Sequence, residues 1–256
     1  MRAGSNPILN LKPTGDMTPK RQRAILDLVK QLNRKHLQER DLGDDLSARM
    51  DAYELAYRMQ SEASEIVDLT QETRITQRLY GIDQKETAEF GARCLLARRM
   101  VERGVRFVQL YSGDVNGWDA HRDVAKNHTL YCKRTDKPIA GLLRDLKQRG
   151  LLEDTLVIWG GEFGRMPMNE GGTGRDHNPW GYSYWLAGAG VKGGTVHGAT
   201  DDFGLRAVQG KVHIHDLHAT ILHLLGINHT ELTFFHGGRD QRLTDVHGKV
   251  IKEVLQ

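Results

Sequence analysis

Two short apolar runs, separated by one helix-length segment, limit most strongly what this chain can fold into. The first run is VRFVQLY, residues 105–111, and the second is DTLVIWG, residues 154–160. Between them a helical pattern covers residues 123–149 and ends at Gly150. Short buried strands that alternate with helices are typical of α/β proteins. The order therefore predicts an α/β fold with a mostly parallel sheet.

The rest of the chain extends this prediction on both sides. Strands are expected at YSYWLAG (182–188) and GTVHG (194–198), and a helix at HDLHATILHLLG (215–226). Before residue 105 the pattern is almost entirely helical: Thr18 and Pro19 suit a helix start, and Asp83 with Glu86 resembles a capping box. We expect a flexible segment at residues 1–15 and a single α/β domain at 16–256. Within that domain, 16–104 is mainly helical and 105–256 holds the sheet and the site.

Composition excludes several classes of function. The net charge is only +3, and basic and acidic residues alternate in the helical part, so nucleic acid is not expected as a partner. Neither Cys94 nor Cys132 lies in a CxxC pair, which argues against a cysteine metal site. No apolar run approaches the ~20 residues of a membrane span, and the first residues show no signal peptide. Localisation therefore stays open, with no membrane contact expected.

Polar side chains cluster after each of the two apolar runs. Ligands of parallel α/β sheets bind outside the carboxyl ends of the strands, so loops from two such ends can converge on one site. The first loop supplies two aspartates and a histidine, and the second supplies two acids, an arginine and a histidine. In order, they are Asp114, Asp119, His121, Glu162, Arg165, Asp176 and His177.

Carboxylates and imidazoles gathered at one point are costly to hold together unless a cation lies between them. Mixed donors of this kind suit zinc or manganese, and calcium or magnesium if oxygen ligands dominate. Arg165 could bind a phosphate or sulfate group with its planar fork, and the nearby glycines would let the backbone approach the ligand. We predict a divalent metal site, with one or two ions, whose ligands are Asp119, His121, Glu162, Asp176 and His177.

Simpler interpretations of the same residues remain open. Asp119 and His121 could form hydrogen bonds within a turn, and Asp176 and His177 could cap a glycine-rich surface loop. Arg165 could be a structural ion-pair partner. Six further histidines near the C-terminal end fit no HExxH or finger spacing, and we do not expect them to bind metal.

Four motifs occur in the order of a known family: GWDAH, VIWGGEFGRMP, GRDHNPWGYSYWLAGAG and HDLHATILHLLGI. Over residues 15–256 the chain resembles the large bacterial family known as domain of unknown function 1501. That family resembles the alkaline phosphatase and sulfatase superfamily. The resemblance implies an α/β/α sandwich and a metal-dependent hydrolase site. By position, Glu162 resembles the acidic metal ligand that the superfamily keeps after a central strand. Asp119 and His121 resemble the ligand pair at the end of the preceding strand, and His177 with Asp176 resembles the ligand that comes later, in the glycine-rich segment.

One departure from the superfamily pattern concerns the nucleophile. Superfamily enzymes carry a metal-binding Asp and a Ser, Thr or modified Cys nucleophile in the N-terminal third, whereas this chain is helical before residue 105. The resemblance then implies the C-terminal portion of a longer, exported protein, incomplete at its N-terminus and with an unknown nucleophile. A sheet that lacks its N-terminal strands would have open edges, and open edges would favour a homo-oligomer.

Three hypotheses follow for the function of the chain. The first is a metal-dependent hydrolase of phosphate or sulfate esters, acting on a small anionic ester or a sulfated glycan and possibly inactive in this form. The second is a non-catalytic module that binds a metal and an anion. The third is a structural protein whose loops are merely well hydrogen-bonded.

Overall fold

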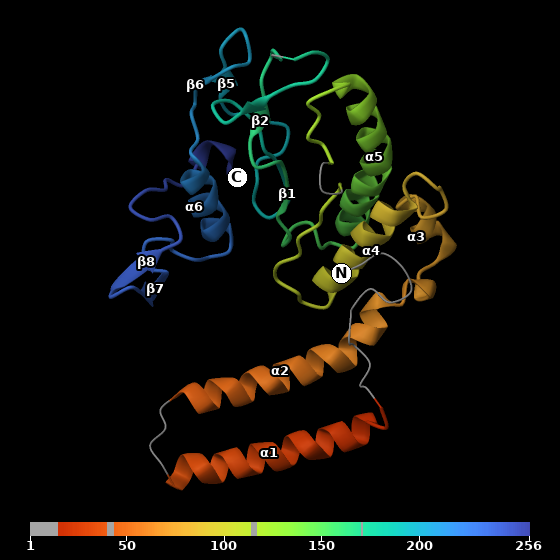
Figure 1. Cartoon of the computed structure of the whole chain (residues 1–256), viewed down its shortest axis with the longest axis vertical. Coiled ribbons are helices and arrows are strands. Elements are labelled where there is room, and N and C mark those ends of the chain that lie inside the picture. Colours follow the sequence, from red (N-terminus) through yellow and green to blue (C-terminus); the bar gives the residue numbers. More distant parts are fainter. Residues whose placement is uncertain (1–14, 40–43, 114–116, 170) are drawn as a thin grey trace. The chain divides into compact units, whose positions relative to one another are not determined.

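The computed structural model describes residues 15–39, 44–113, 117–169 and 171–256. The chain divides into two compact units, Met1–Val108 and Gln109–Gln256. The first unit is helical and the second mixes helices with short strands (Figure 1). The division lies close to residue 105, where the sequence changes from helical to strand-like patterns. The chain is therefore a mixed helix and strand protein.

The first unit begins with two long helices, α1 (Pro19–Glu39) and α2 (Asp44–Val67), that lie antiparallel (Figure 1). The predicted start of α1 is confirmed, because the Arg21 amide donates to Thr18 Oγ1 at 3.2 Å. Arg23 links the helices by donating to both carboxylate oxygens of Glu54 at 2.9 and 3.0 Å. The apolar stripe that predicted α1 stays largely exposed, at 42–58% for Ile25, Leu28, Val29 and Leu32.

The core of the first unit lies around α4 (Ala88–Glu102), which follows η1 (Leu69–Gln71) and α3 (Arg74–Leu79). Tyr80, Cys94 and Leu95 are at most 1% exposed. The expected helix start at Asp83 is wrong, because residues 83–87 form turns and the Thr87 hydroxyl donates to the Gly81 carbonyl. Local turn bonds therefore outcompete the capping-box pattern.

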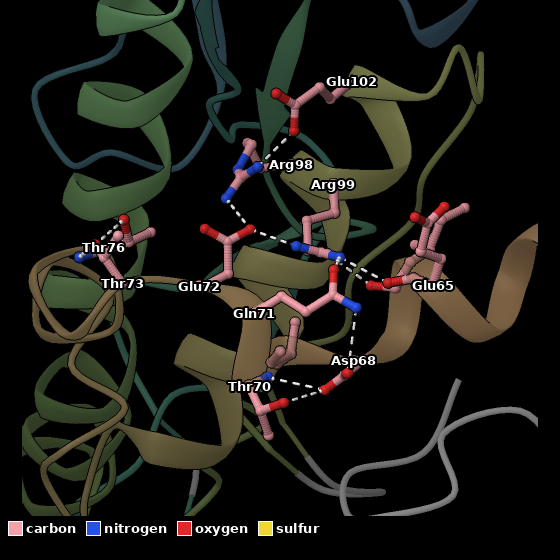
Figure 2. Close-up of polar contacts among 12 residues, drawn as sticks. Glu65, Asp68, Thr70, Gln71, Glu72, Thr73, Thr76, Arg98, Arg99 and Glu102 are labelled. Carbon is pink, nitrogen blue, oxygen red and sulfur yellow. Dashed lines mark hydrogen bonds and ion pairs between the residues drawn. The ribbon is translucent and has the colours of Figure 1, made fainter.

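A cluster of polar contacts and ion pairs joins η1 and the end of α2 to α4 (Figure 2). Its central residues, Glu72, Arg98 and Arg99, are almost closed to solvent. The Glu72 carboxylate accepts from Arg98 at 2.7 Å and from Arg99 at 2.6 Å, although its side chain is only 9% exposed. Arg99 also donates to the carbonyl oxygens of Ile66 and Glu65 at 2.8 and 2.6 Å. Burial raises the pKa of Glu72, but the hydrogen bonds from Arg99 and Arg98 outweigh it and hold the pKa below its usual value.

The second unit contains α5 (Val124–Gln148), α6 (Ile214–Leu224), η2 (Lys252–Val254) and eight short strands. The strands form four separate antiparallel pairs among the described residues. The pairs are β1 (Val157–Trp159) with β4 (Trp185–Ala187), β2 (Gly164–Arg165) with β3 (His177–Asn178), β5 (Ala199–Thr200) with β6 (Ala207–Gln209), and β7 (Thr233–His236) with β8 (Arg239–Arg242). Tyr131, Leu146, Leu217, Ala219 and Leu222 are buried.

The mostly parallel sheet is not present in the part of the chain that the structure describes. Residues 105–111 form no strand, and Phe107 and Tyr111 are 74% and 67% exposed. Residues 194–198 also form no strand, whereas β1, β4, α5 and α6 lie where they were expected. The physical reason is that an apolar run becomes a strand only when another strand satisfies its backbone groups, and sequence periodicity does not identify that partner. Among the described helices, none combines the length and apolar composition that a membrane crossing requires.

Candidate metal centre

Three of the predicted site residues bring one donor atom each to a common point in the second unit. Nε2 of His121 lies 3.1 Å from Nε2 of His177, and each of these nitrogens lies 3.1 Å from Oδ1 of Asp119. Within the described residues, this trio is the group of His, Cys, Asp and Glu side chains that could hold a metal ion. Their side chains are 39–49% exposed, so a ligand can reach them from solvent.

The short β2–β3 ladder explains why Arg165 and His177 meet. Arg165 and His177 are directly opposite each other in this antiparallel pair, so their side chains share one face. Just beyond His177, Asn178 is fully buried; its side chain donates to the Leu205 carbonyl at 2.9 Å and accepts from the Trp180 amide at 3.0 Å. The strand that carries His177 is therefore anchored on the side away from the site.

A second set of backbone contacts holds the loop of Asp119 and His121 against the glycine-rich loop. The Arg175 amide donates to the Ala120 carbonyl at 2.9 Å, and the Val124 amide donates to the Thr173 carbonyl at 3.1 Å. Gly174 lies so close to His121 that a Cβ atom there would overlap the His121 carbonyl group. The two loops therefore approach each other at backbone distance, which sets their donors side by side.

Asp176 lies behind His121 and does not join the three donors. Its Oδ1 is 3.3 Å from Nδ1 of His121, on the opposite edge of the ring from the cluster. A carboxylate in this position favours the tautomer with hydrogen on Nδ1, which leaves the Nε2 lone pair directed at the shared point. Asp176, predicted as a ligand, contacts the far nitrogen of His121 and is not part of the three-residue donor group.

The spacing of the three donors matches the space that a small divalent ion needs. Zinc lies about 2.0–2.1 Å from nitrogen and oxygen ligands, so two ligands in tetrahedral geometry are about 3.3 Å apart. Without a cation, the three contacts cannot all be hydrogen bonds, because each neutral imidazole Nε2 carries at most one hydrogen and the carboxylate carries none.

Arg165 supplies positive charge to the same carboxylate. Its NH1 group donates to Asp119 Oδ1, and its guanidinium lies 5.8 Å from the centre of the Phe163 ring. Burial raises the pKa of Asp119, but hydrogen bonds from His177 and Arg165 outweigh this effect and lower the pKa below its usual value. Asp119 is therefore ionised at neutral pH, as a metal ligand has to be.

The remaining predicted site residues are placed elsewhere or lie outside the described residues. Glu162 is not part of the donor group; together with burial and Tyr182, it raises the pKa of Tyr184. Asp114 lies outside the described residues. The glycines do not all serve a ligand, since a Cβ at Gly160 would overlap the Tyr184 ring.

Sequence reasoning missed one residue of the site, Phe163. Its ring lies 4.3 Å from that of His177, centre to centre, and it forms the apolar wall behind this imidazole. The signal available was its place two residues before Arg165, since alternate residues of a strand share one face.

Comparison with known proteins identifies the family of the chain. The model for a family described as protein of unknown function (DUF1501) matches residues 1–255, so the chain belongs to this family. The match starts at the first residue, and it does not support the expectation that only a C-terminal portion of the family pattern is present. Searches of curated proteins and of solved structures found no match.

Proposed function

We propose that the second unit is a metal-dependent hydrolase of phosphate or sulfate esters, with Asp119, His121 and His177 as metal ligands. The single observation that carries the proposal is the 3.1 Å triangle of donor atoms, with a carboxylate that orients one of its imidazoles. The resemblance of the family to the alkaline phosphatase and sulfatase superfamily supports the same class of reaction.

Each residue has a distinct part in this proposal. Asp119 and the two imidazoles hold the cation, and Asp176 keeps His121 in the tautomer that can do so. A zinc or manganese ion held there would act as a Lewis acid toward an ester oxygen; calcium or magnesium is less suited to two imidazole ligands. Once a cation neutralises Asp119, the Arg165 fork is free to hold the oxygens of a tetrahedral phosphate or sulfate group.

The overall reaction adds water across the ester bond, so that phosphate or sulfate and an alcohol are released. The substrate class is an anionic ester, either a small molecule or a sulfated glycan. The cationic Arg165 lies next to the donor group, so an anion is the ligand that the local charge favours.

A second function is favoured by one specific observation. Among the described residues, no Ser, Thr or Cys hydroxyl or thiol is hydrogen-bonded to any of the three donor atoms. Covalent catalysis needs such a nucleophile within hydrogen-bond reach of its activating group. The alternative is therefore a module that binds a metal and an oxyanion without turnover.

Elemental mass spectrometry of the purified protein tests the metal site directly. We expect about one equivalent of zinc or manganese in the wild type and almost none in His121→Ala and His177→Ala. His236→Ala is the matched control, because His236 is an exposed histidine of the same unit that lies outside the donor group. A folded wild-type protein that takes up no added zinc, manganese, calcium or magnesium would overturn the proposal.

Hydrolysis of p-nitrophenyl phosphate and p-nitrophenyl sulfate separates the two functions. Turnover that follows the metal content across these variants supports the hydrolase. The binding module is supported, and the hydrolase is excluded, if the protein holds stoichiometric metal but turns over neither ester. In that case sulfate or phosphate should still protect the Arg165 side chain from an arginine-modifying reagent.

A further inference from the structure

A line of basic residues runs along one exposed face of α5, directly after the candidate metal centre. Lys126, Lys133, Lys137 and Arg144 recur at spacings of seven, four and seven residues, which places them on one face of a helix. At 1.5 Å per residue, this row extends about 27 Å along the helix axis. Lys126, Lys133 and Arg144 are exposed and Lys137 is half-buried. We call these four residues the α5 basic row.

The row carries charge that the described part of the protein does not neutralise. Among the described residues, no side-chain hydrogen bond or ion pair is found for its four members. The buried acid of α5, Asp145, pairs instead with Arg149 at 2.8 Å. Lys133 and Lys137, four residues apart, repel each other and slightly destabilise the helix unless an anion lies over them.

An open groove of about 390 Å³ lies at the beginning of this row. Arg122, Lys126 and Lys133 contribute three cations to its lining, and Asn127 and Thr129 contribute polar uncharged groups. The acidic residue of the lining, Asp123, accepts a hydrogen bond from the Thr173 hydroxyl at 3.2 Å. The charged side chains of the lining sum to a net positive charge, whereas the exposed surface of the groove is mainly apolar and includes Leu130.

The groove and the candidate metal centre adjoin each other in the same unit. Arg122 follows His121 in the chain, and the Asp123 amide donates to Thr173 Oγ1 at 2.9 Å, in the loop that leads to His177. An extended anion that lies along the α5 basic row can therefore reach the three donors with one of its groups.

We propose that the α5 basic row binds a polyanionic polysaccharide that carries sulfate esters, and that it guides one ester group toward the candidate metal centre. The second part rests on the proposed function; the first part does not. Three of the four cations are lysines, which bind anions as point charges. Sites for single-stranded nucleic acid combine cations with aromatic stacking platforms, and the lining of the groove contains no aromatic residue. A sugar chain that is recognised by its charges and hydroxyl groups fits this surface better.

Retention on immobilised heparin, measured as a function of salt, tests the binding of a sulfated polysaccharide. The variant Lys126→Gln/Lys133→Gln/Lys137→Gln removes three charges from exposed or half-exposed positions, and Gln is a good helix former. We expect its affinity for heparin in solution to fall about tenfold or more, with a shallower salt dependence. The matched control, Lys20→Gln/Arg21→Gln/Arg34→Gln, removes three exposed charges from the helical unit and should bind as the wild type does.

Desulfated heparin and DNA define the chemistry of the ligand. We expect desulfated heparin to bind much more weakly than heparin, and neutral dextran not to bind. Equal heparin affinity of the wild type and the α5 triple variant would overturn the proposal, and so would single- or double-stranded DNA that binds as tightly as heparin of similar length.

The heparin assay needs neither metal nor turnover, so its outcome is separate from that of the proposed function. If the α5 triple variant loses heparin binding, the polysaccharide site is supported even when the protein binds no metal. The absence of metal would then overturn only the hydrolase. Stoichiometric metal with no binding of heparin overturns the polysaccharide site alone.

Discussion

Two clusters of charged residues, one in each unit, differ in what completes them. In the helical unit, the Glu72 carboxylate lies between Arg98 and Arg99, and the protein supplies its counter-charges from inside (Figure 2). In the second unit, Asp119, His121 and His177 point donor atoms at one another, and the Arg165 guanidinium forms an ion pair with Asp119.

The difference shows how structural and binding roles can be separated by geometry. The Glu72 cluster is nearly closed to solvent and its carboxylate is paired with two guanidinium groups of the protein, which is what an arrangement that stabilises a fold requires. The three donors of the second unit are partly exposed, and they carry more lone pairs than there are hydrogens to bond them, which is what a ligand site requires. Substitutions in the first cluster should therefore change stability, and substitutions in the second should change affinity.

The largest effect is expected for Glu72→Gln. Glu72→Gln removes the charge that Arg98 and Arg99 share inside the protein, while Arg98 keeps its ion pair with Glu102. Losing one charge of a buried ion cluster costs about 3–5 kcal/mol of unfolding free energy. Urea unfolding, with hydrogen exchange of α4 to locate the change, measures it. Glu65→Gln is the control, because Glu65 pairs with Arg103 at an exposed site and should cost less than about 1 kcal/mol. Equal losses in both variants would contradict the contrast drawn between the clusters.

A smaller effect, on affinity alone, is expected for Asp176→Asn. The amide no longer favours hydrogen on Nδ1 of His121 as a carboxylate does, and loss of such an orienting partner typically weakens metal binding about 10- to 100-fold. Competition with a chromophoric zinc chelator measures the change, while the unfolding free energy of the metal-free protein stays within about 0.5 kcal/mol. Unchanged zinc affinity would show that Asp176 does not orient the ligand.

The pH dependence of stability should also distinguish the two units. The pKa of Glu72 is lower in the folded protein than its usual value of 4.5, so its stabilising contribution is complete above that value. The contribution is lost as the pH falls through the folded pKa, because the unfolded chain then binds the proton more strongly. The unfolding free energy of the helical unit should therefore decrease as the pH falls below about 4.5. In the Glu72→Gln variant this decrease should be smaller. An unchanged slope in the variant would exclude Glu72 as its source.

The smallest effect concerns the two thiols, one in each unit. Cys94 is buried, which raises the pKa of its thiol to about 12, whereas Cys132 is exposed. A disulfide reagent at pH 8 should label Cys132 quickly and Cys94 only after denaturation, because the thiolate is the reactive form. Mass spectrometry of the labelled peptides measures both rates. Rapid labelling of Cys94 in the native protein would show that the core of the helical unit opens readily.

The elements that could be predicted were those specified by local chemistry. Thr18 and Pro19 marked the start of α1, and the pattern of residues 123–149 predicted α5 nearly to its ends. The apolar run before Gly160 predicted β1. At the level of residue types, the sequence indicated one cluster after two expected strand ends, made of Asp114, Asp119, His121, Glu162, Arg165, Asp176 and His177.

Tertiary structure decided what sequence patterns cannot contain, namely which segments become partners. The run at 105–111 has the composition of a strand but no strand beside it, and β1 pairs antiparallel with β4. Register in the β2–β3 ladder placed Arg165 opposite His177, and left Glu162 outside the donor group. The sequence thus determined which chemical groups the loops carry, whereas the pairing of β2 with β3 and the contact of two loops at Gly174 decided which groups meet. The physical reason is that residue type is a local property, whereas proximity depends on backbone hydrogen bonds between segments far apart in the chain.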